Sequence, residues 1–305
     1  MNDMMEIPMA NKDSDLVIGF ITGYKYDHKV APWTESLIES GFTGTKMMVT
    51  YNIDKSVIEK LQSLGFVVLP FENDGKFNIV NIRFLHIWQY LKTLKVKPRY
   101  IISTDVADVI FQSNPSDWLE QNIGDKKLCA SAESLLYKNE AWGIHNMYQS
   151  FGDTAAQYMA NTPIYNAGIT AGTYEEYIDL CYNVYLLCNG APMFVEGGGG
   201  PDQAALNLLL SLKPYKDITL YTNHDDGWAC QCGTTVDPTK IEKFRPNLLS
   251  PEPVWKDGVM YNSRGDKYAI LHQYNRVPAI NDYIRKKYER SFDIQHNERF
   301  VYTTN

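Results

Sequence analysis

The possible folds of this chain are restricted most by residues 99–115, which read Arg-Tyr-Ile-Ile-Ser-Thr-Asp-Val-Ala-Asp-Val-Ile-Phe-Gln-Ser-Asn-Pro. The segment begins with an apolar, β-branched run at 100–102, which is typical of a strand buried on both faces of a sheet. Two carboxylates, Asp105 and Asp108, follow this strand, and Asn114-Pro115 predicts a turn after the next apolar run. Because helices must cover both faces of such a strand, the segment predicts an α/β protein.

The two acids indicate a site for a divalent cation. A buried strand carries acids only at its carboxyl end, which is also where open α/β sheets bind ligands. Hard divalent cations prefer oxygen ligands and leave positions open for phosphate, and no basic residue stands beside Asp105 or Asp108 in the sequence. The alternative is that Asp105 caps a turn and Asp108 is a solvated loop acid.

The part of the chain before this segment alternates strands and helices. Apolar runs predict strands at 16–22, 46–51 and 66–70, and helical periodicity predicts helices at 31–40, 54–64 and 78–94. This β-α-β-α-β order predicts a parallel, right-handed, doubly wound sheet. Thr22, Gly23 and Tyr24 end the first strand at a glycine turn, which either offers backbone N–H groups to a nucleotide or is an ordinary strand-to-helix turn.

The second half of the chain contributes two segments rich in small residues. Asn166-Ala167-Gly168 lies in a predicted strand and turn at 162–172, where glycine either lets the backbone approach a ligand or makes a tight sheet bend. Four glycines at 197–200 precede Pro201 and a helix that begins with Asp202 and Gln203. That carboxylate and amide either cap the helix or face a ligand site.

Three more side chains are candidates for the same site. Arg83 lies in the middle of the predicted helix at 78–94, where it is either a surface group or a contact for a diphosphate. Glu133 follows a short apolar run at 127–132 that predicts another strand. His272 lies in the apolar run of 269–276 and is either a structural histidine or a ligand for the suspected cation.

Composition narrows the class of protein. A formal charge of −7 and a pI near 5.4 argue against nucleic acid or an anionic membrane as the main partner. No segment has the roughly 18 consecutive apolar residues that a membrane span needs, and the polar start of the chain does not resemble a signal peptide. The five scattered cysteines predict reduced thiols, and we therefore expect a cytoplasmic protein without stable membrane insertion.

The chain is long enough for one large α/β domain or two smaller ones. We found neither internal repeats nor a low-complexity linker. The expected organisation is a disordered leader at 1–14, one domain at 15–280, and a charged, helical tail at 281–305.

These residues together resemble the nucleotide-sugar-dependent glycosyltransferases of the GT-A fold. Asp105-Val-Ala-Asp108-Val-Ile-Phe-Gln-Ser-Asn-Pro115 is similar to a "D-x-x-D-V-x-F-Q-x-x-P" version of that fold's D-x-D metal motif. The resemblance covers roughly residues 16–276, with Asn166-Ala-Gly168, Asp202-Gln203 and His272 following in the family's order. It implies a single Rossmann-like domain with a mostly parallel central sheet flanked by helices. By the apolar residues that follow, Asp108 matches the family's second, metal-binding aspartate, so Asp105 stands one residue early.

The resemblance also implies an activity and roles for residues. Such an enzyme moves a sugar from a UDP or GDP sugar to a hydroxyl of a glycan or other acceptor, assisted by Mn²⁺ or Mg²⁺. The implied metal ligands are Asp105, Asp108 and His272. The implied contacts to the nucleotide and donor sugar are Thr22, Gly23, Tyr24, Arg83, Asp105, Asn166, Ala167, Gly168 and Gln203.

Two carboxylates are candidates for catalysis. Asp202 resembles the late acidic residue of these enzymes, which is the base in inverting members and holds the donor sugar in retaining members, and Glu133 competes for the base role. Asp202-Gln203 followed by a metal-site histidine is closer to a retaining layout. Trp142, Tyr165 and Trp228 are either an acceptor platform or ordinary core residues.

Two other classes of protein remain open. A sugar nucleotidyltransferase shares the sheet and the metal chemistry, but its first loop is usually rich in glycine and basic residues, unlike Thr22-Gly23-Tyr24-Lys25. A non-catalytic carbohydrate- or nucleotide-binding protein is the third class. Faster release of nucleoside diphosphate on addition of an acceptor would distinguish a transferase from both.

Overall fold

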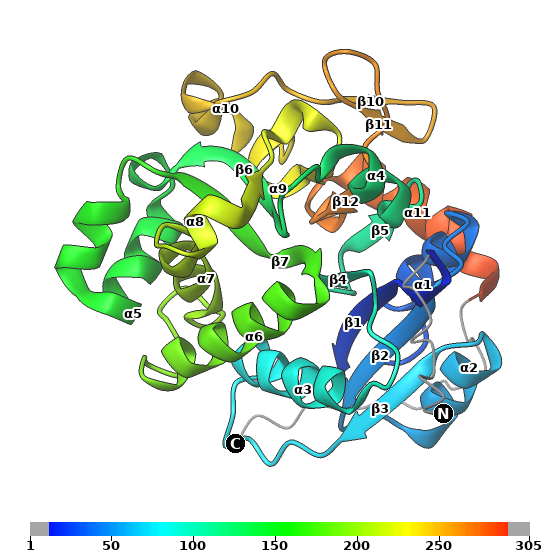
Figure 1. The fold of residues 1–305 in the computed structure, drawn as a ribbon. Helices are drawn as coiled ribbons and strands as arrows, with labels where there is room; N and C mark the ends of the chain where they lie inside the picture. Colours follow the sequence, from blue (N-terminus) through cyan, green and yellow to red (C-terminus); the bar gives the residue numbers. More distant parts are fainter. Residues whose placement is uncertain (1–11, 292–305) are drawn as a thin grey trace, which may run out of the picture.

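The computed structural model describes residues 12–291 (Figure 1). Residues 1–11 of the expected leader and 292–305 of the expected tail lie outside the described residues. The last three residues of the expected leader form a short 3-10 helix, Lys12–Ser14. Within the described part of the chain, no helix is both long enough and apolar enough to cross a membrane.

The centre of the described structure is a seven-stranded sheet (Figure 1). In spatial order its strands are β3 (Val67–Phe71), β2 (Thr45–Tyr51), β1 (Leu16–Thr22), β4 (Tyr100–Thr104), β7 (Pro163–Thr173), β6 (Leu128–Leu136) and β8 (Thr219–Tyr221). The pairs from β3 to β4 and the pair β6–β8 are parallel, whereas β7 runs antiparallel to both of its neighbours. The mostly parallel α/β fold predicted from the sequence is therefore confirmed.

Helices cover both faces of this sheet, as the buried strands require. The larger helices are α1 (Ala31–Glu39), α2 (Lys55–Ser63), α3 (Ile79–Thr93), α4 (Pro115–Asn122), α5 (Ala141–Met159), α6 (Tyr174–Asn189), α7 (Asp202–Leu210) and α11 (Pro278–Tyr288). Alternate side chains of β1 separate the two cores: Leu16 and Ile18 pack with α3, α6 and α7, while Val17 and Ile21 pack with α1 and α2. Short helices are α8 (Tyr215–Ile218), α9 (Cys232–Thr235) and α10 (Ile241–Phe244).

A second, smaller sheet brings distant parts of the chain to the carboxyl end of β4. Its strands, in order, are β5 (Val109–Phe111), β12 (Ile270–His272) and β9 (Ala229–Gln231). The apolar run after Asp108 thus starts this sheet instead of continuing β4. A separate hairpin consists of β10 (Val254–Lys256) and β11 (Val259–Tyr261).

Two predictions about single elements were wrong. β7 runs without the predicted turn at 162–172, because hydrogen bonds to β4 and β6 on both sides hold it extended. The sequence also predicts a helix at 147–160, but helix α5 begins at Ala141, because the Glu140 carboxylate accepts hydrogen bonds from the first turn. Helix α11 begins at Pro278 and crosses the boundary expected at 280, and its Ile284 is buried in the same apolar cluster as Leu271 of β12.

The cysteines agree with the prediction of reduced thiols. All five lie within the described residues, and each is free and buried. The sulfurs of Cys230 and Cys232 are 3.8 Å apart and unbonded.

Candidate active site

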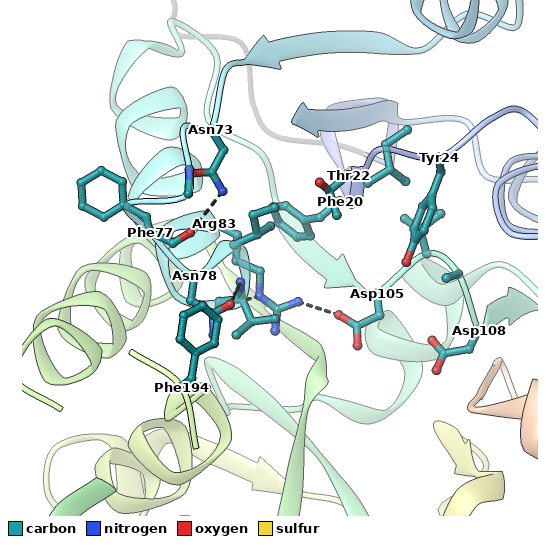
Figure 2. A pocket seen from close by; sticks show the side chains of 16 residues that line it. Phe20, Thr22, Tyr24, Asn73, Phe77, Asn78, Arg83, Asp105, Asp108 and Phe194 are labelled. Atoms are coloured by element: carbon teal, nitrogen blue, oxygen red, sulfur yellow. Dashed lines mark hydrogen bonds and ion pairs between the residues drawn. The ribbon is translucent and has the colours of Figure 1, made fainter. Parts of the chain in front are cut away.

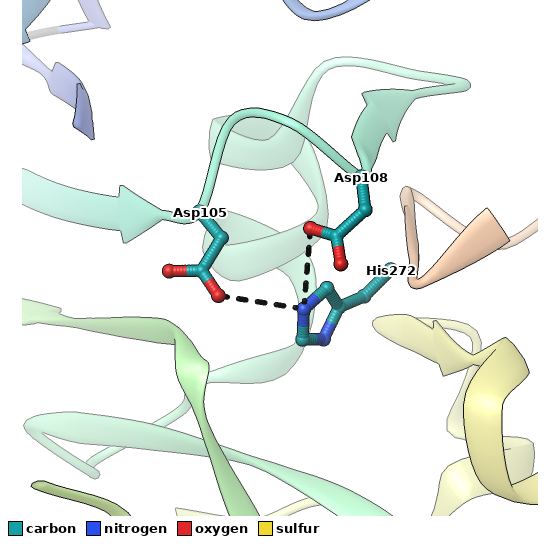
Figure 3. Close-up of side chains that lie close together, drawn as sticks. All are labelled: Asp105, Asp108 and His272. Carbon is teal, nitrogen blue, oxygen red and sulfur yellow. Dashed lines mark ion pairs between the residues drawn. The ribbon is translucent and has the colours of Figure 1, made fainter. Parts of the chain in front are cut away.

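Asp105, Asp108 and His272 meet at the carboxyl end of β4 (Figure 3). Nε2 of His272 lies 3.6 Å from Oδ2 of Asp105 and 3.7 Å from Oδ1 of Asp108. One ligand atom from each residue lies within 4.8 Å of the other two. The backbone sets this spacing, because antiparallel pairing of β12 with β5 places His272 opposite Val109, the residue after Asp108. We call these three residues the Asp-Asp-His cluster.

The orientation of the His272 ring depends on a residue that the sequence analysis did not single out. His272 is only 2% exposed, and its Nδ1 donates a hydrogen bond to Oε1 of Gln231 at 2.7 Å. Gln231 is in turn held by its backbone N–H, which donates to Nε2 of His224 at 2.9 Å. With the proton on Nδ1, a neutral His272 presents the lone pair of Nε2 to two carboxylates, an arrangement that suits a metal ion between them.

A glycine leaves room for this cluster. A β-carbon on Gly168 would lie 2.6 Å from Oδ2 of Asp105 and 2.7 Å from Cε1 of His272. Gly168 also anchors Asp105 through its carbonyl, which accepts a hydrogen bond from the Asp105 backbone N–H. The donor set, its spacing and this empty space all fit a divalent cation with oxygen and imidazole ligands.

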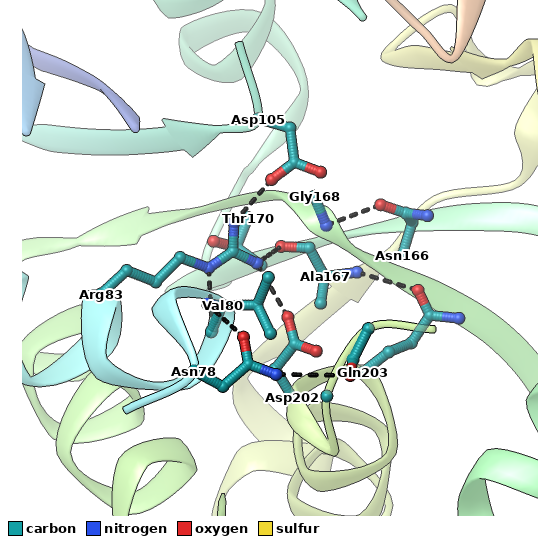
Figure 4. Close-up of polar contacts among 12 residues, drawn as sticks. Asn78, Val80, Arg83, Asp105, Asn166, Ala167, Gly168, Thr170, Asp202 and Gln203 are labelled. Carbon is teal, nitrogen blue, oxygen red and sulfur yellow. Dashed lines mark hydrogen bonds and ion pairs between the residues drawn. The ribbon is translucent and has the colours of Figure 1, made fainter. Parts of the chain in front are cut away.

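Arg83 connects the cluster to the helix that begins at Asp202 (Figure 4). Its guanidinium donates to Oδ1 of Asp105 at 2.6 Å, to Oδ2 of Asp202 at 2.9 Å and to the carbonyl of Ala167 at 3.1 Å. Arg83 is 4% exposed, so its charge is committed to these acceptors. Asp105 has no basic neighbour in the sequence, but the fold brings Arg83 to it.

The charged groups of the cluster shift one another's pKa values. Burial alone would raise the pKa of Asp105, but Arg83 and His272 outweigh burial and hold that pKa well below its usual range. Burial would lower the pKa of His272, but Asp108 and Asp105 raise it above its usual value. Burial raises the pKa of Asp108, which also lies beside the negative Asp105. A bound cation would offset the free energy of keeping both carboxylates ionised.

The two candidate catalytic carboxylates differ in their partners. Asp202 faces Arg83 and does not cap its helix, and burial raises its pKa to about 6 despite the attraction of Arg83. Oε1 of Glu133 accepts a hydrogen bond from Nδ2 of Asn166 at 2.6 Å, and burial raises the pKa of Glu133 as well. Asn166 also accepts from the Gly168 N–H, so it joins Glu133 to the strand beside the cluster.

An aromatic cavity of about 560 Å³ opens on one side of Asp105 (Figure 2). It extends from the end of β1 to the Asp-Asp-His cluster, and its apolar rings are those of Phe20, Tyr24, Phe77 and Phe194. Thr22 of the expected nucleotide loop also lines it, whereas Gly23 does not line it and forms the turn with φ of +58°.

A polar cavity of about 640 Å³ opens on the other side of Asp105. It collects nearly all the residues expected along the donor sugar and at the catalytic centre: Glu133, Asn166, Ala167, Gly168, Asp202 and Gln203. The backbone N–H of Ala167 donates to Oε1 of Gln203 at 3.4 Å. Arg83 and Asp105 line both cavities, so the two spaces meet at the cluster.

The three aromatic residues considered for an acceptor platform lie in different places. Trp142 lines the polar cavity. Trp228 is 0% exposed and packs against Trp118 in the core, so it cannot reach a ligand. Tyr165 lines a different, smaller cavity beside Tyr221. Gln231, Lys240 and Arg276 also lie at the site but were not predicted from the sequence. Of these, only Arg276 stands close to a predicted site residue in the sequence, four residues after His272.

No protein-family model matches this sequence, and neither does any curated protein sequence. Among solved structures, the chain is similar to the apo form of the glycosyltransferase GlyE of Streptococcus pneumoniae TIGR4, with 15% identity, a TM-score of 0.49, and 85% of this chain and 54% of that one covered. It is also similar to the apo structure of the bifunctional glycosyltransferase WbbM, with 11% identity, a TM-score of 0.52, and 96% and 53% covered. The WbbM match shows a shared fold alone. The chain spans about half the length of both solved chains.

Proposed function

We propose that this chain is a metal-dependent glycosyltransferase that moves a sugar from a UDP or GDP sugar to a hydroxyl group of a glycan or another acceptor. One observation carries the proposal: the aromatic cavity and the polar cavity meet at Asp105, beside the Asp-Asp-His cluster. A nucleotide sugar has the same order of parts, since a charged diphosphate joins an aromatic base to a polar sugar. The fold shared with part of WbbM supports the proposal.

The metal ligands and Arg83 would have separate roles. Asp105, Asp108 and His272 would hold Mn²⁺ or Mg²⁺, which supplies Lewis-acid stabilisation of the diphosphate leaving group. Arg83 keeps Asp105 ionised and fixes its direction through a hydrogen bond to Oδ1. The aromatic cavity would take the base, with Tyr24 and Phe194 as stacking surfaces.

The two carboxylates of the polar cavity would act on different substrates. Oδ2 of Asp202 accepts a hydrogen bond from Arg83, which also donates to the carbonyl of Ala167. This position is suited to holding hydroxyl groups of the donor sugar. Glu133 would face the acceptor hydroxyl, because its pKa is raised and Asn166 occupies only one of its oxygens. The anomeric signal of the product in NMR distinguishes two roles for Glu133, because inversion would assign proton removal to it and retention would assign positioning alone.

The first experiment is calorimetric titration of the protein with UDP and with GDP, with and without Mn²⁺. We expect one nucleotide to bind at least tenfold more tightly with Mn²⁺, because the diphosphate and the cluster share the metal. Asp108→Asn should remove this gain, while Asp125→Asn, an exposed acid outside both cavities, should keep it.

A second step tests transfer itself. Sugar donors of the nucleotide that binds are screened for release of nucleoside diphosphate, with and without acceptor glycans. Nucleotide binding that ignores both Mn²⁺ and Asp108, or no release from any donor, would contradict the proposal.

A further inference from the structure

Two cationic side chains line the polar cavity, and the proposed function gives neither of them a role. Lys240, directly before α10, and Arg276, at the end of the 3-10 helix Tyr274–Arg276, line it together with Thr234 and Gln273. Among residues 12–291, neither the Lys240 ammonium nor the Arg276 guanidinium has a hydrogen bond or ion pair with another side chain. Two unpaired cations in one concave site favour an anionic ligand.

Within the described residues, the acids of the same cavity make their hydrogen bonds and ion pairs with groups other than these two cations. Asp105 and Asp202 are bound by Arg83, and Glu133 is bound by Asn166. Glu140 accepts hydrogen bonds from the backbone N–H groups of Trp142 and Gly143 at the start of α5. The free positive charge of the cavity is therefore concentrated at Lys240 and Arg276.

Arg276 is directed into the cavity. One of its terminal nitrogens lies 2.9 Å from the position of a β-carbon on Gly233, so the missing side chain of Gly233 gives it room. Arg276 lines this cavity together with His272 of the cluster and Glu133. Arginine is well suited to carboxylate and phosphate because its planar fork binds two oxygens at once.

An aromatic ring accompanies the cations. Trp142 lines the same cavity from the first turn of α5, and the glycine at 197 passes so close that its β-carbon would lie 3.1 Å from the indole. The indole is half-buried, with part of its surface left to the cavity. A flat apolar ring beside two cations fits a sugar ring that carries an acidic group.

We propose that the polar cavity selects an acceptor sugar bearing a carboxylate or a phosphate, with Lys240 and Arg276 binding the anion and Trp142 contacting the sugar ring. This inference rests on the proposed function, in which the base of the donor occupies the aromatic cavity and the donor sugar lies at Asp202 in the polar cavity. It adds the chemical class of the acceptor, which the fold does not specify.

The test uses three matched probes on the full chain: methyl β-D-glucoside, its 6-phosphate, and methyl β-D-glucuronide. Their dissociation constants are measured by saturation-transfer NMR with Mg²⁺, in the presence and absence of nucleoside diphosphate. We expect at least one charged probe to bind at least tenfold more tightly than the neutral one, also when nucleoside diphosphate is present. The relative affinity of the two charged probes distinguishes phosphate from carboxylate.

Four variants locate the effect. Lys240→Gln and Arg276→Gln should each weaken binding of the preferred charged probe several-fold, and the double variant should bind charged and neutral probes equally. Lys243→Gln, an exposed lysine of α10 outside both cavities, should behave as the unmodified protein. Trp142→Ala should weaken all three probes alike, because it removes ring contact and not charge.

Three results would overturn the inference: equal binding of all probes, a charge preference that survives in the double variant, or loss of that preference on addition of nucleoside diphosphate. The last would show that the cations serve the donor diphosphate. Failure of the proposed function is seen separately, as absent metal-dependent nucleotide binding, and the probe affinities can be measured in either case.

Discussion

Gly168 occupies a position where a side chain would displace the groups around it. A β-carbon at Gly168 would lie 2.6 Å from Oδ2 of Asp105 and 2.7 Å from Cε1 of His272, and both distances are far shorter than an ordinary contact. Gly168→Ala should therefore push these two ligands apart and weaken Mn²⁺ binding at least tenfold, as measured by calorimetry. Gly190→Ala is the matched control, because a β-carbon there meets nothing closer than 3.6 Å and Mn²⁺ affinity should not change. Equal affinities in both variants would show that Asp105 and His272 do not hold the metal together.

His224 makes stability depend on pH. Burial lowers its pKa to about 4, and its Nε2 accepts the Gln231 N–H, which protonation would break. Since the folded pKa lies below the unfolded value, the unfolded state binds more protons as pH falls from about 6.5 to 4. Stability should thus be constant above this window and decrease by about 2 kcal/mol between pH 7 and pH 5 through this group.

Urea unfolding at the two pH values measures this loss. His224→Gln keeps an acceptor for the Gln231 N–H and should remove the histidine's share of the pH dependence. His145→Gln, at a half-exposed histidine on α5, should leave that dependence as it is. Identical pH dependence in all three proteins would assign the loss to other groups.

At the level of residues, the sequence predicted that Asp105, Asp108 and His272 meet, but it did not predict the side chains that hold them. Asp105, Asp108 and His272 could be predicted because each ends or follows an apolar strand run, and strand ends meet at one sheet edge. The pairing of Arg83 with Asp105 could not, because it joins positions 22 residues apart through a helix whose rotation only packing decides. Gln231 lies in a stretch without periodicity, so no pattern indicated its contact with His272.

Among the elements, the segment at 190–201 between α6 and α7 is joined to the start of α3 by the side chain of Asn78. Asn78 caps α3 by accepting the Val80 N–H, and its Nδ2 donates to the carbonyls of Met193 and Gly199 in that segment. The segment supplies Phe194 to the aromatic cavity. One amide thus joins the start of a helix to the rim of the candidate nucleotide site.

Asn78→Ala should have two effects. Loss of the cap should destabilise the protein by about 1 kcal/mol, and loss of the link to the segment should weaken nucleotide binding several-fold. Asn114 caps α4 through the same type of bond to Ser116, away from both cavities, so Asn114→Ala should show only the first effect. Urea unfolding and nucleotide titration measure the two quantities, and equal nucleotide affinity in both variants would refute the role of the segment.

Strands and helices with strong periodicity were predicted, and those that depend on tertiary contacts were not. The first three strands and the helices between them follow from local apolar pattern alone. β7 was misread because Asn166-Ala-Gly168 has the composition of a turn, and only pairing on both sides keeps it extended. In the small sheet, β12 lies within the apolar run of 269–276, which predicts a strand, whereas β5 and β9 are too short for a period to appear.

At the scale of the whole molecule, the last described helix supports the candidate metal site. Ile284 of α11 is 1% exposed and packs in the cluster that contains Leu271, the neighbour of His272. Ile284→Ala should destabilise the protein by about 2–5 kcal/mol, because it leaves a cavity in that cluster. Lys286→Ala, at an exposed position of the same helix, should change stability by less than about 0.5 kcal/mol. Urea unfolding measures both, and a loss under about 1 kcal/mol for Ile284→Ala would mean that α11 is not part of the cooperative fold.

The spacing of the metal ligands has a consequence for the history of such a chain. Main-chain pairing of β5 with β12 sets His272 opposite Val109 and thus beside Asp108, and any side chains compatible with a strand can maintain that pairing. Mutations that exchange the apolar residues of these strands alter packing but not register. Sequences that descend from one ancestor can therefore lose nearly all recognisable similarity while two ligands of the cluster keep their separation. Common ancestry is thus better detected by comparing strand pairing than by comparing sequences.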